Sequence, residues 1–337
     1  MNLINKNYKN IVSIWLLGSI TLVFFMIIIG GLTRLTDSGL SITEWELFKG
    51  IFPPFNEESW YEYFNLYKTI PQFKLLYPDM TLNEFKVIFY WEYFHRLLGR
   101  LIGLFFLLPL IYFTYKKVFE KKVLITLYFI FFLIVFQGII GWYMVESGLI
   151  NEVTVSHYRL SLHLFLAFII ISILFWNYLN FENYYKQFLN LKNKMLKLLL
   201  IIVFLQIILG AFVSGLDAGM VYQTWPKMNL SFFPDDINLK DYGIISLFDQ
   251  QSFVQFIHRL MAYGLFFLVI LIGYNFYLKN KKPHLLSYLI LFSIIIIQIL
   301  LGIFTLVSGL NVYLASMHQI TSIVLVFSVL NLNHKFS

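Results

Sequence analysis

The sequence predicts an all-α integral membrane protein whose eight transmembrane helices form two parallel-repeat four-helix bundles. The first observation behind this fold class is composition. Of the 337 residues, 59% are hydrophobic and only 13% are charged, and the mean hydropathy is +0.74. A soluble domain of this size cannot cover so much apolar side chain, so the lipid bilayer is the expected surrounding. The second is a set of eight long apolar segments, and the third is an internal repeat.

The eight apolar segments are each long enough to cross a bilayer, which takes roughly 20 residues. The backbone must satisfy its own hydrogen bonds inside lipid, so each segment is expected to be a helix. The predicted spans are 11–33, 89–113, 123–145, 157–179, 195–215, 252–277, 284–307 and 312–332.

Charge patterning predicts the orientation of the chain. Lysines gather in one set of connecting segments, whereas the opposite set is net acidic. Cytoplasmic loops are enriched in Lys and Arg, so we expect a multi-pass protein of the cell inner membrane with both termini in the cytoplasm. These lysines also account for the net charge of +7, so no nucleic-acid partner is expected. The lysines of the basic set are Lys6, Lys9, Lys116, Lys117, Lys121, Lys122, Lys186, Lys192, Lys194, Lys197, Lys279, Lys281, Lys282 and Lys335.

The two halves of the chain share their motifs in the same order. We therefore expect an N-terminal half at 1–180 and a C-terminal half at 181–337, each with four helices and in the same orientation. Each half has one long outer loop, at 34–88 and 216–251, in which we expect short interfacial helices. Capping boxes are expected at Thr81–Glu84 and Ser252–Gln255. The repeated pairs are 29–39 with 209–219, 92–97 with 255–260, 137–141 with 298–302, 147–149 with 308–310, and 162–163 with 317–318.

Four histidines occupy equivalent positions in this repeat, namely His95, His163, His258 and His318. Each is expected about six residues inside the outer end of an even-numbered span, or roughly 9 Å along a helix. Two imidazoles in one four-helix bundle are the ligand set of a bis-histidine heme, so two iron-porphyrin sites are predicted. The alternative is four hydrogen-bonded histidines without a metal. The chain has no cysteine, which excludes thiolate heme ligation and iron–sulfur clusters.

The side chains around the histidines differ between the halves. Glu92 precedes His95 by three residues, on the same helix face, whereas its counterpart Gln255 cannot exchange protons. This asymmetry suggests that one half performs chemistry while the other carries electrons. The alternative for Glu92 is an ion pair with a neighbouring arginine. The arginines Arg96, Arg100 and Arg259 are candidates for binding porphyrin propionates or for reaching lipid headgroups. Gln137, Gln206 and Gln298 are expected to bond helix to helix.

At these residues the chain resembles the heme A synthase family, in its cysteine-free kind known from some bacteria and mitochondria. The matching stretches lie at 30–41, Trp91–Arg100, 155–160, 223–228 and 256–259. The resemblance implies oxidation of a pyrrole methyl of heme o, through a hydroxymethyl stage, to the formyl group of heme a. It implies that Glu92, His95 and His163 form the active site. The other kind in the family carries a cysteine pair in its first outer loop, which this chain lacks.

The resemblance further implies that His258 and His318 hold a permanent heme b as an electron relay. It makes heme o synthase, a farnesyltransferase, the expected neighbour in the pathway. Water and O₂ both remain open as the source of the oxygen. Two other functions are alternatives: a bis-histidine membrane cytochrome b that carries electrons from quinol, and a heme or metal transporter. The first predicts equivalent sites, and the second predicts sites near the bilayer midplane with broken helices.

Overall fold

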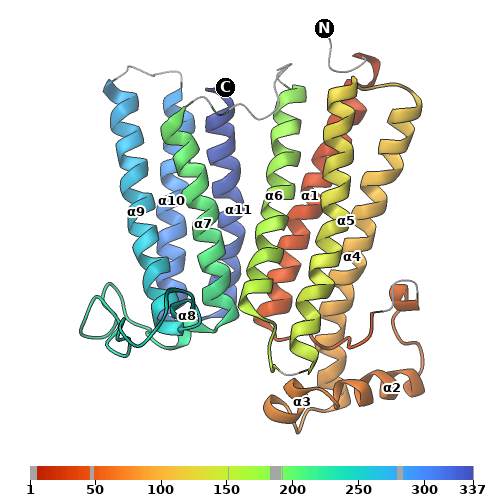
Figure 1. The fold of residues 1–337 in the computed structure, drawn as a ribbon. Helices are drawn as coiled ribbons and strands as arrows, with labels where there is room; N and C mark the ends of the chain where they lie inside the picture. Colours follow the sequence, from red (N-terminus) through yellow and green to blue (C-terminus); the bar gives the residue numbers. More distant parts are fainter. Residues whose placement is uncertain are drawn as a thin grey trace. The chain divides into compact units, whose positions relative to one another are not determined.

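The computed structural model describes residues 6–45, 49–150, 152–182, 191, 193–278 and 284–336. Within these residues, eight helices are long and apolar enough to cross a membrane, which confirms the eight predicted spans (Figure 1). They are α1 (Lys9–Leu35), α4 (Leu82–Tyr115), α5 (Lys121–Ile150), α6 (His157–Glu182), α7 (Lys194–Gly215), α9 (Gln251–Leu278), α10 (Leu285–Val307) and α11 (Val312–His334).

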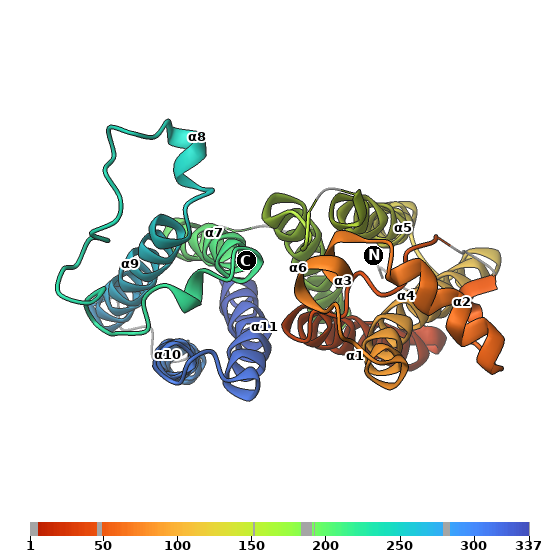
Figure 2. The same cartoon turned by 90° about the horizontal axis from the view of Figure 1, so that it is seen from below.

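The chain divides into two compact units, Met1–Leu174 and Phe175–Ser337. The division falls within α6, whereas the sequence predicted it near the end of the same helix. In the N-terminal unit α4 packs against both α1 and α5, and in the C-terminal unit α7, α9, α10 and α11 pack in a closed ring. Figure 2 shows the C-terminal unit end on, with α7 beside α9 and α10 beside α11.

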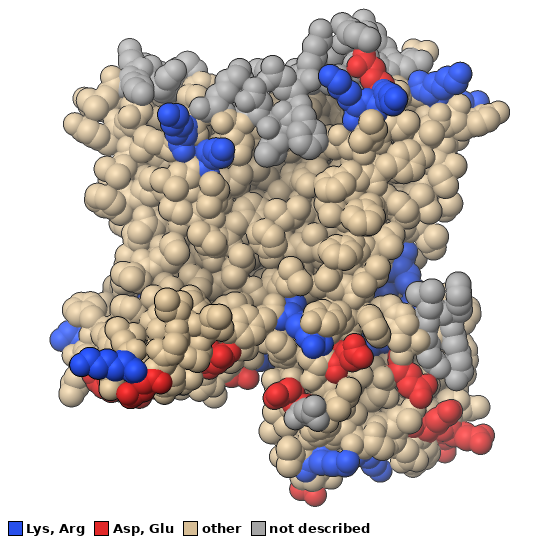
Figure 3. Space-filling view, viewed as in Figure 1, with Lys and Arg blue, Asp and Glu red and all other residues tan. Residues whose placement is uncertain are grey.

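The lateral surface of each unit is apolar. Large hydrophobic side chains such as Leu104, Leu108 and Phe267 are exposed along the long helices. Figure 3 shows an uncharged band on each unit, with Lys, Arg, Asp and Glu gathered at its two ends. An exposed apolar surface of this extent is the surface that lipid covers. Of the predicted basic set, Lys186, Lys192, Lys279, Lys281, Lys282 and the side chain of Lys6 lie outside the described residues.

The first outer loop forms a small aromatic layer on the long helix α4. It contains the two short helices α2 (Glu57–Tyr67) and α3 (Pro71–Leu76), as the sequence predicted. Asn56 caps α2 by accepting a hydrogen bond from the Ser59 backbone N–H, at 2.8 Å. The first turns of α4 share one buried cluster with this loop, which includes Trp60, Phe64 and Phe85. The loop is therefore a folded layer and not a tether.

Helix α4 begins earlier than its predicted span. The capping box at Thr81 and Glu84 is present and starts the helix at Leu82. As a result His95 is the fourteenth residue of α4, whereas His163, His258 and His318 are the seventh, eighth and seventh residues of their helices. The expected spacing from the helix start is thus wrong for His95, because two extra helical turns carry the outer loop.

Buried polar groups fix the start of the first loop. The Tyr67 hydroxyl donates to Gln72 Oε1 at 2.9 Å, and Gln72 Nε2 donates to the Asp37 carbonyl at 3.2 Å. Asp37 adopts a left-handed conformation (φ 51°), and its carboxylate accepts from the Tyr77 hydroxyl at 2.9 Å. Burial raises the pKa of Tyr67 well above its ordinary value, so the hydroxyl keeps its proton.

The second outer loop has little regular structure. It contains the 3₁₀ turn η3 (Ala218–Met220) and the four-residue helix α8 (Ile244–Leu247). Asp236 anchors it by accepting hydrogen bonds from the hydroxyls of Tyr222 and Ser252, both at 2.6 Å. Burial opposes the charged carboxylate, but hydrogen bonds led by those from Ser252 and Tyr222 outweigh it and lower the pKa of Asp236. Ser252 lies inside α9 and binds Asp236, so the capping box predicted at Ser252–Gln255 is wrong.

We expect Tyr67→Phe to lower the free energy of unfolding by about 2 kcal/mol, because it leaves the buried Gln72 acceptor without its donor. Equilibrium unfolding in an SDS titration would measure this loss. Tyr61→Phe, on the exposed side of the same helix, is the matched control and should change little. Equal effects of the two substitutions would contradict the role given to the Tyr67 hydroxyl.

Candidate functional site

The first pair of histidines lies within the N-terminal unit, on α4 and α6. Each ring packs against a glycine of a neighbouring helix. A Cβ atom on Gly30 of α1 would lie 3.0 Å from His95 Nε2, and one on Gly141 of α5 would lie 3.0 Å from His163 Cε1. Both imidazoles are half-buried, and their pairing as ligands of one iron stays a prediction.

The second pair repeats this arrangement in the C-terminal unit. A Cβ atom on Gly210 of α7 would lie 3.3 Å from His258 Cε1, and one on Gly302 of α10 would lie 2.9 Å from His318 Cε1. His258 and His318 are both half-buried, as the first pair is.

The ring nitrogens of the second pair suit metal ligation. His318 Nδ1 donates to the Gln298 carbonyl at 3.0 Å, because a carbonyl can only accept. This hydrogen bond places the proton on Nδ1, so the lone pair that a metal could take is that of Nε2, which lies 3.4 Å from Gln298 Nε2. The buried Nδ1 of His258 has no hydrogen-bond partner within the described part of the chain.

The residues present therefore fit a porphyrin iron in each unit. Two neutral imidazoles are the axial donor set of a six-coordinate heme. The glycine beside each ring leaves room that any larger side chain would fill. His95 and His163 would ligate one iron, and His258 and His318 the other.

Glu92 lies one turn before His95 and is almost fully buried, at 2% exposed. Its Oε1 accepts from Arg96 Nη2 at 2.6 Å and from Arg96 Nε at 3.0 Å. Its Oε2 accepts from the Ser41 hydroxyl at 2.7 Å and from the Ile42 backbone N–H at 2.9 Å. The carboxylate thus joins α4 to the first outer loop, and the ion pair weighed as its alternative role is present.

The corresponding residues of the C-terminal unit make matching contacts. Gln255 Nε2 donates to the Tyr222 carbonyl at 3.0 Å, and Arg259 Nη2 donates to the same oxygen at 2.9 Å. In the N-terminal unit, Arg96 Nη2 donates to the Ile42 carbonyl at 2.8 Å. Ile42 and Tyr222 are 180 residues apart, as are Gly30 and Gly210. The two loops are therefore tied to their helices through equivalent positions, with an ion pair in one unit only.

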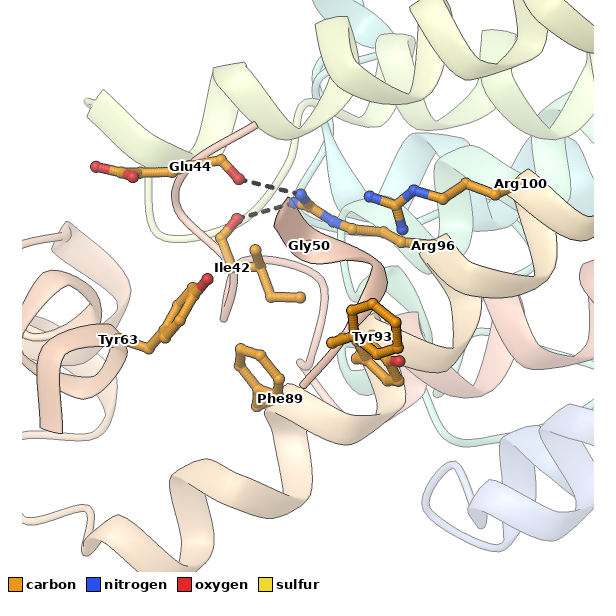
Figure 4. Close-up of a pocket in the computed structure, with 9 residues that line it drawn as sticks. Ile42, Glu44, Gly50, Tyr63, Phe89, Tyr93, Arg96 and Arg100 are labelled. Atoms are coloured by element: carbon orange, nitrogen blue, oxygen red, sulfur yellow. Dashed lines mark hydrogen bonds between the residues drawn. The ribbon is translucent and has the colours of Figure 1, made fainter. Parts of the chain in front are cut away.

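The three arginines lie near the loops that cover the histidine pairs. A small pocket between the first loop and α4 is lined by Arg96 and Arg100, which lie side by side (Figure 4). Arg96 also donates to the Glu44 carbonyl at 3.3 Å, and Arg259 donates to the Thr224 carbonyl at 2.9 Å. Propionate binding by Arg96, Arg100 and Arg259 stays a prediction. A propionate that binds Arg96 or Arg259 must either share the guanidinium with the loop carbonyls or displace them.

The glutamines were expected to bond helix to helix, and they do, but their common target was not foreseen. Gln137, Gln206 and Gln298 each donate to the backbone carbonyl of a candidate ligand, His163, His258 and His318 respectively, at 2.9–3.0 Å. Each glutamine precedes by four residues the glycine that faces the same histidine. A Gln-x-x-x-Gly pattern in the apolar segments was the signal that could have revealed this contact.

The fold and the site define a class: all-helical, multi-pass membrane proteins with histidines on four of the apolar helices that are candidate membrane spans. Comparison with known proteins narrows the class. Residues 13–330 match the family described as cytochrome oxidase assembly protein, and the chain belongs to that family.

Several heme A synthases are similar to the chain over nearly its whole length. The protein of Pelagibacter ubique is 47% identical over 336 residues, which cover 99% of this chain and 98% of that protein. The protein of Bartonella quintana is 42% identical, covering 97% and 92%. The protein of Rickettsia prowazekii is 40% identical, covering 94% and 96%. These relatives match the family that the sequence motifs indicated.

We expect Glu92→Ala to lower the free energy of unfolding by about 3 kcal/mol, because it leaves the largely buried Arg96 without its anion. Gln255→Ala removes a neutral hydrogen bond at the equivalent position, so its loss should be only about 1 kcal/mol. An SDS titration of both variants beside the wild type measures the difference. Equal losses would show that the ion pair adds nothing beyond a neutral contact.

Proposed function

We propose that this protein is a heme A synthase. It oxidises a pyrrole methyl of heme o to a hydroxymethyl group and then to the formyl group of heme a, which serves cytochrome oxidase. The observation that carries the proposal is the asymmetry between two otherwise matching units: Glu92 is a carboxylate where Gln255 is an amide. The full-length similarity to heme A synthases supports the same reaction.

The C-terminal unit is proposed as the permanent cofactor site. His258 and His318 would hold a heme b, whose iron supplies one-electron redox chemistry when it is bound. The Nδ1 hydrogen bond of His318 to the Gln298 carbonyl supports this assignment, because it fixes the ring and keeps Nε2 for the metal. At the position equivalent to Glu92, α9 has the amide Gln255, which cannot exchange protons. This suits a site that only passes electrons.

The N-terminal unit is proposed as the substrate site, with His95 and His163 as ligands of the heme o iron. Conversion of a methyl to a formyl group removes two electrons in each of two steps, protons leave the reacting carbon, and one oxygen atom enters from water or O₂. With water the electrons pass to an external acceptor, and with O₂ the O₂ is itself the oxidant. Glu92 is proposed as the acceptor of these protons. Its position one turn from His95 supports this role, and its partners Arg96, Ser41 and Ile42 orient the carboxylate.

The repeat and the membrane placement belong to the same proposal. We take residues 1–180 and 181–337 as two copies of one four-helix unit, supported by the matching histidine, glycine and arginine contacts. The lysine-rich connecting segments favour both termini in the cytoplasm, in a cell inner membrane. Heme o synthase, the farnesyltransferase that makes the substrate, is the proposed partner.

One observation favours a second candidate, a bis-histidine cytochrome b that carries electrons. The contacts around the histidines are so similar in the two units that they could hold two equivalent hemes. A cytochrome b requires both hemes to be bound permanently. In such a protein Glu92 would only anchor the first outer loop to α4.

Counting hemes separates the two candidates. We expect the protein purified from a host without heme o to hold about one heme b per chain, and His258→Ala to hold none. The pyridine hemochrome assay measures both. Two hemes in the wild type and one in the variant would instead indicate equivalent carriers.

We expect Glu92→Gln to lower the rate of heme a formation by roughly 100-fold or more, the typical contribution of a general base. The amide resembles the native Gln255 in shape, so heme b content should be unchanged. Chromatographic separation of hemes o and a after incubation with heme o measures the conversion. A variant that still converts heme o at the wild-type rate would leave Glu92 with the anchoring role alone.

A further inference from the structure

Three of the four candidate ligands are held from a neighbouring helix by the same contact. The amide nitrogens of Gln137, Gln206 and Gln298 donate to the histidine backbone carbonyls at 3.0, 3.0 and 2.9 Å. In each case the amide also lies within 3.2–3.4 Å of a ring nitrogen of that histidine. Gln298 is itself fixed by the Thr321 hydroxyl. In His258 and His318 that ring nitrogen is Nε2, which would bind the iron, so the ring contact gives way when heme binds. The backbone contact remains and holds the helical turn that carries the ligand.

The fourth ligand lacks this contact because the residue in the equivalent place is a methionine. The glutamines stand four residues before Gly141, Gly210 and Gly302, and Met26 stands four residues before Gly30. Met26 reaches toward α4, where its Cε lies 3.3 Å from the Cβ position of Gly99, one turn beyond His95. A thioether has no hydrogen to donate, so Met26 packs against this turn without bonding to it.

We propose that Met26 makes His95 the releasable axial ligand of the substrate heme, and that Gln137, Gln206 and Gln298 are positioning residues for the three retained ligands. The inference rests on the proposed function, in which the N-terminal unit must exchange heme at every turnover. Outer contacts to a ligating histidine orient the ring and strengthen metal binding, and their loss typically weakens it 10- to 100-fold. The site with one unsupported ligand therefore releases heme faster than the site with two supported ligands.

The glutamine contacts are distributed as expected for one unit that keeps its heme and one unit that exchanges it. Both ligands in the C-terminal unit carry the glutamine contact, as expected for a permanent cofactor. In the N-terminal unit only His163 carries it. Heme o would thus be held on the α6 side while the bond to His95 forms and breaks.

The test exchanges the two side chains between sites. Methionine and glutamine have nearly the same length, so Met26→Gln should reach the His95 carbonyl as the native glutamines reach theirs. Met26→Leu is the matched control without a donor, and Gln206→Met is the reverse change in the other unit. The full-length protein, purified with its heme b, is loaded with heme o, and the transfer of both hemes to excess apomyoglobin is followed spectroscopically. His95→Ala and His258→Ala assign the kinetic phases to the two units.

We expect Met26→Gln to slow heme loss from the N-terminal unit roughly 10-fold, Met26→Leu to leave it unchanged, and Gln206→Met to speed loss from the C-terminal unit by a similar factor. General damage to the fold cannot produce the slower release. The inference is overturned if Met26→Gln releases heme as Met26→Leu does, or if Gln206→Met keeps its heme as long as the wild type. No turnover is needed, so failure to form heme a would contradict the proposed function and not this assignment.

Discussion

The close approach of each candidate ligand to a glycine on the adjacent helix is the constraint on which the rest of the structure depends. A side chain at Gly30, Gly141, Gly210 or Gly302 would occupy the space at the histidine ring, because its Cβ would lie 2.9–3.3 Å from a ring atom. The glycines thus let four imidazoles lie inside two helical units. The long apolar helices, the glutamine contacts and the folded loops all serve to keep these rings in place.

The two units differ at a few equivalent positions beside the histidines, and the proposed function depends on these differences. Glu92 against Gln255 places an ionisable group in one unit only, and Met26 against the three glutamines leaves one ligand with weaker support. Both differences fall in the N-terminal unit, beside His95. In the proposed function, an enzyme that holds one heme and converts another needs two similar sites with different retention and different proton chemistry. We infer that these two positions supply those differences.

Much of this arrangement could be predicted from the sequence. The eight spans follow from hydropathy, because lipid requires helices of a set length. The histidine pairs follow from the order of the repeat. The extension of α4 to Leu82 was underestimated because its outer turns are buried by the loop and not by lipid. The contact of Glu92 with Ser41 joins residues about fifty positions apart, which no local pattern indicates. Ser252 had the local signature of a cap, yet tertiary contact with Asp236 decides its role.

The measurement that tests the account most directly is an experimental structure of the full-length protein prepared with heme b and heme o together. Heme o carries a farnesyl chain, so the two porphyrins can be told apart in the density. The account predicts the porphyrin without that chain between His258 and His318, and the farnesylated porphyrin between His95 and His163. A farnesylated heme between His258 and His318, or the same heme in both units, would contradict it.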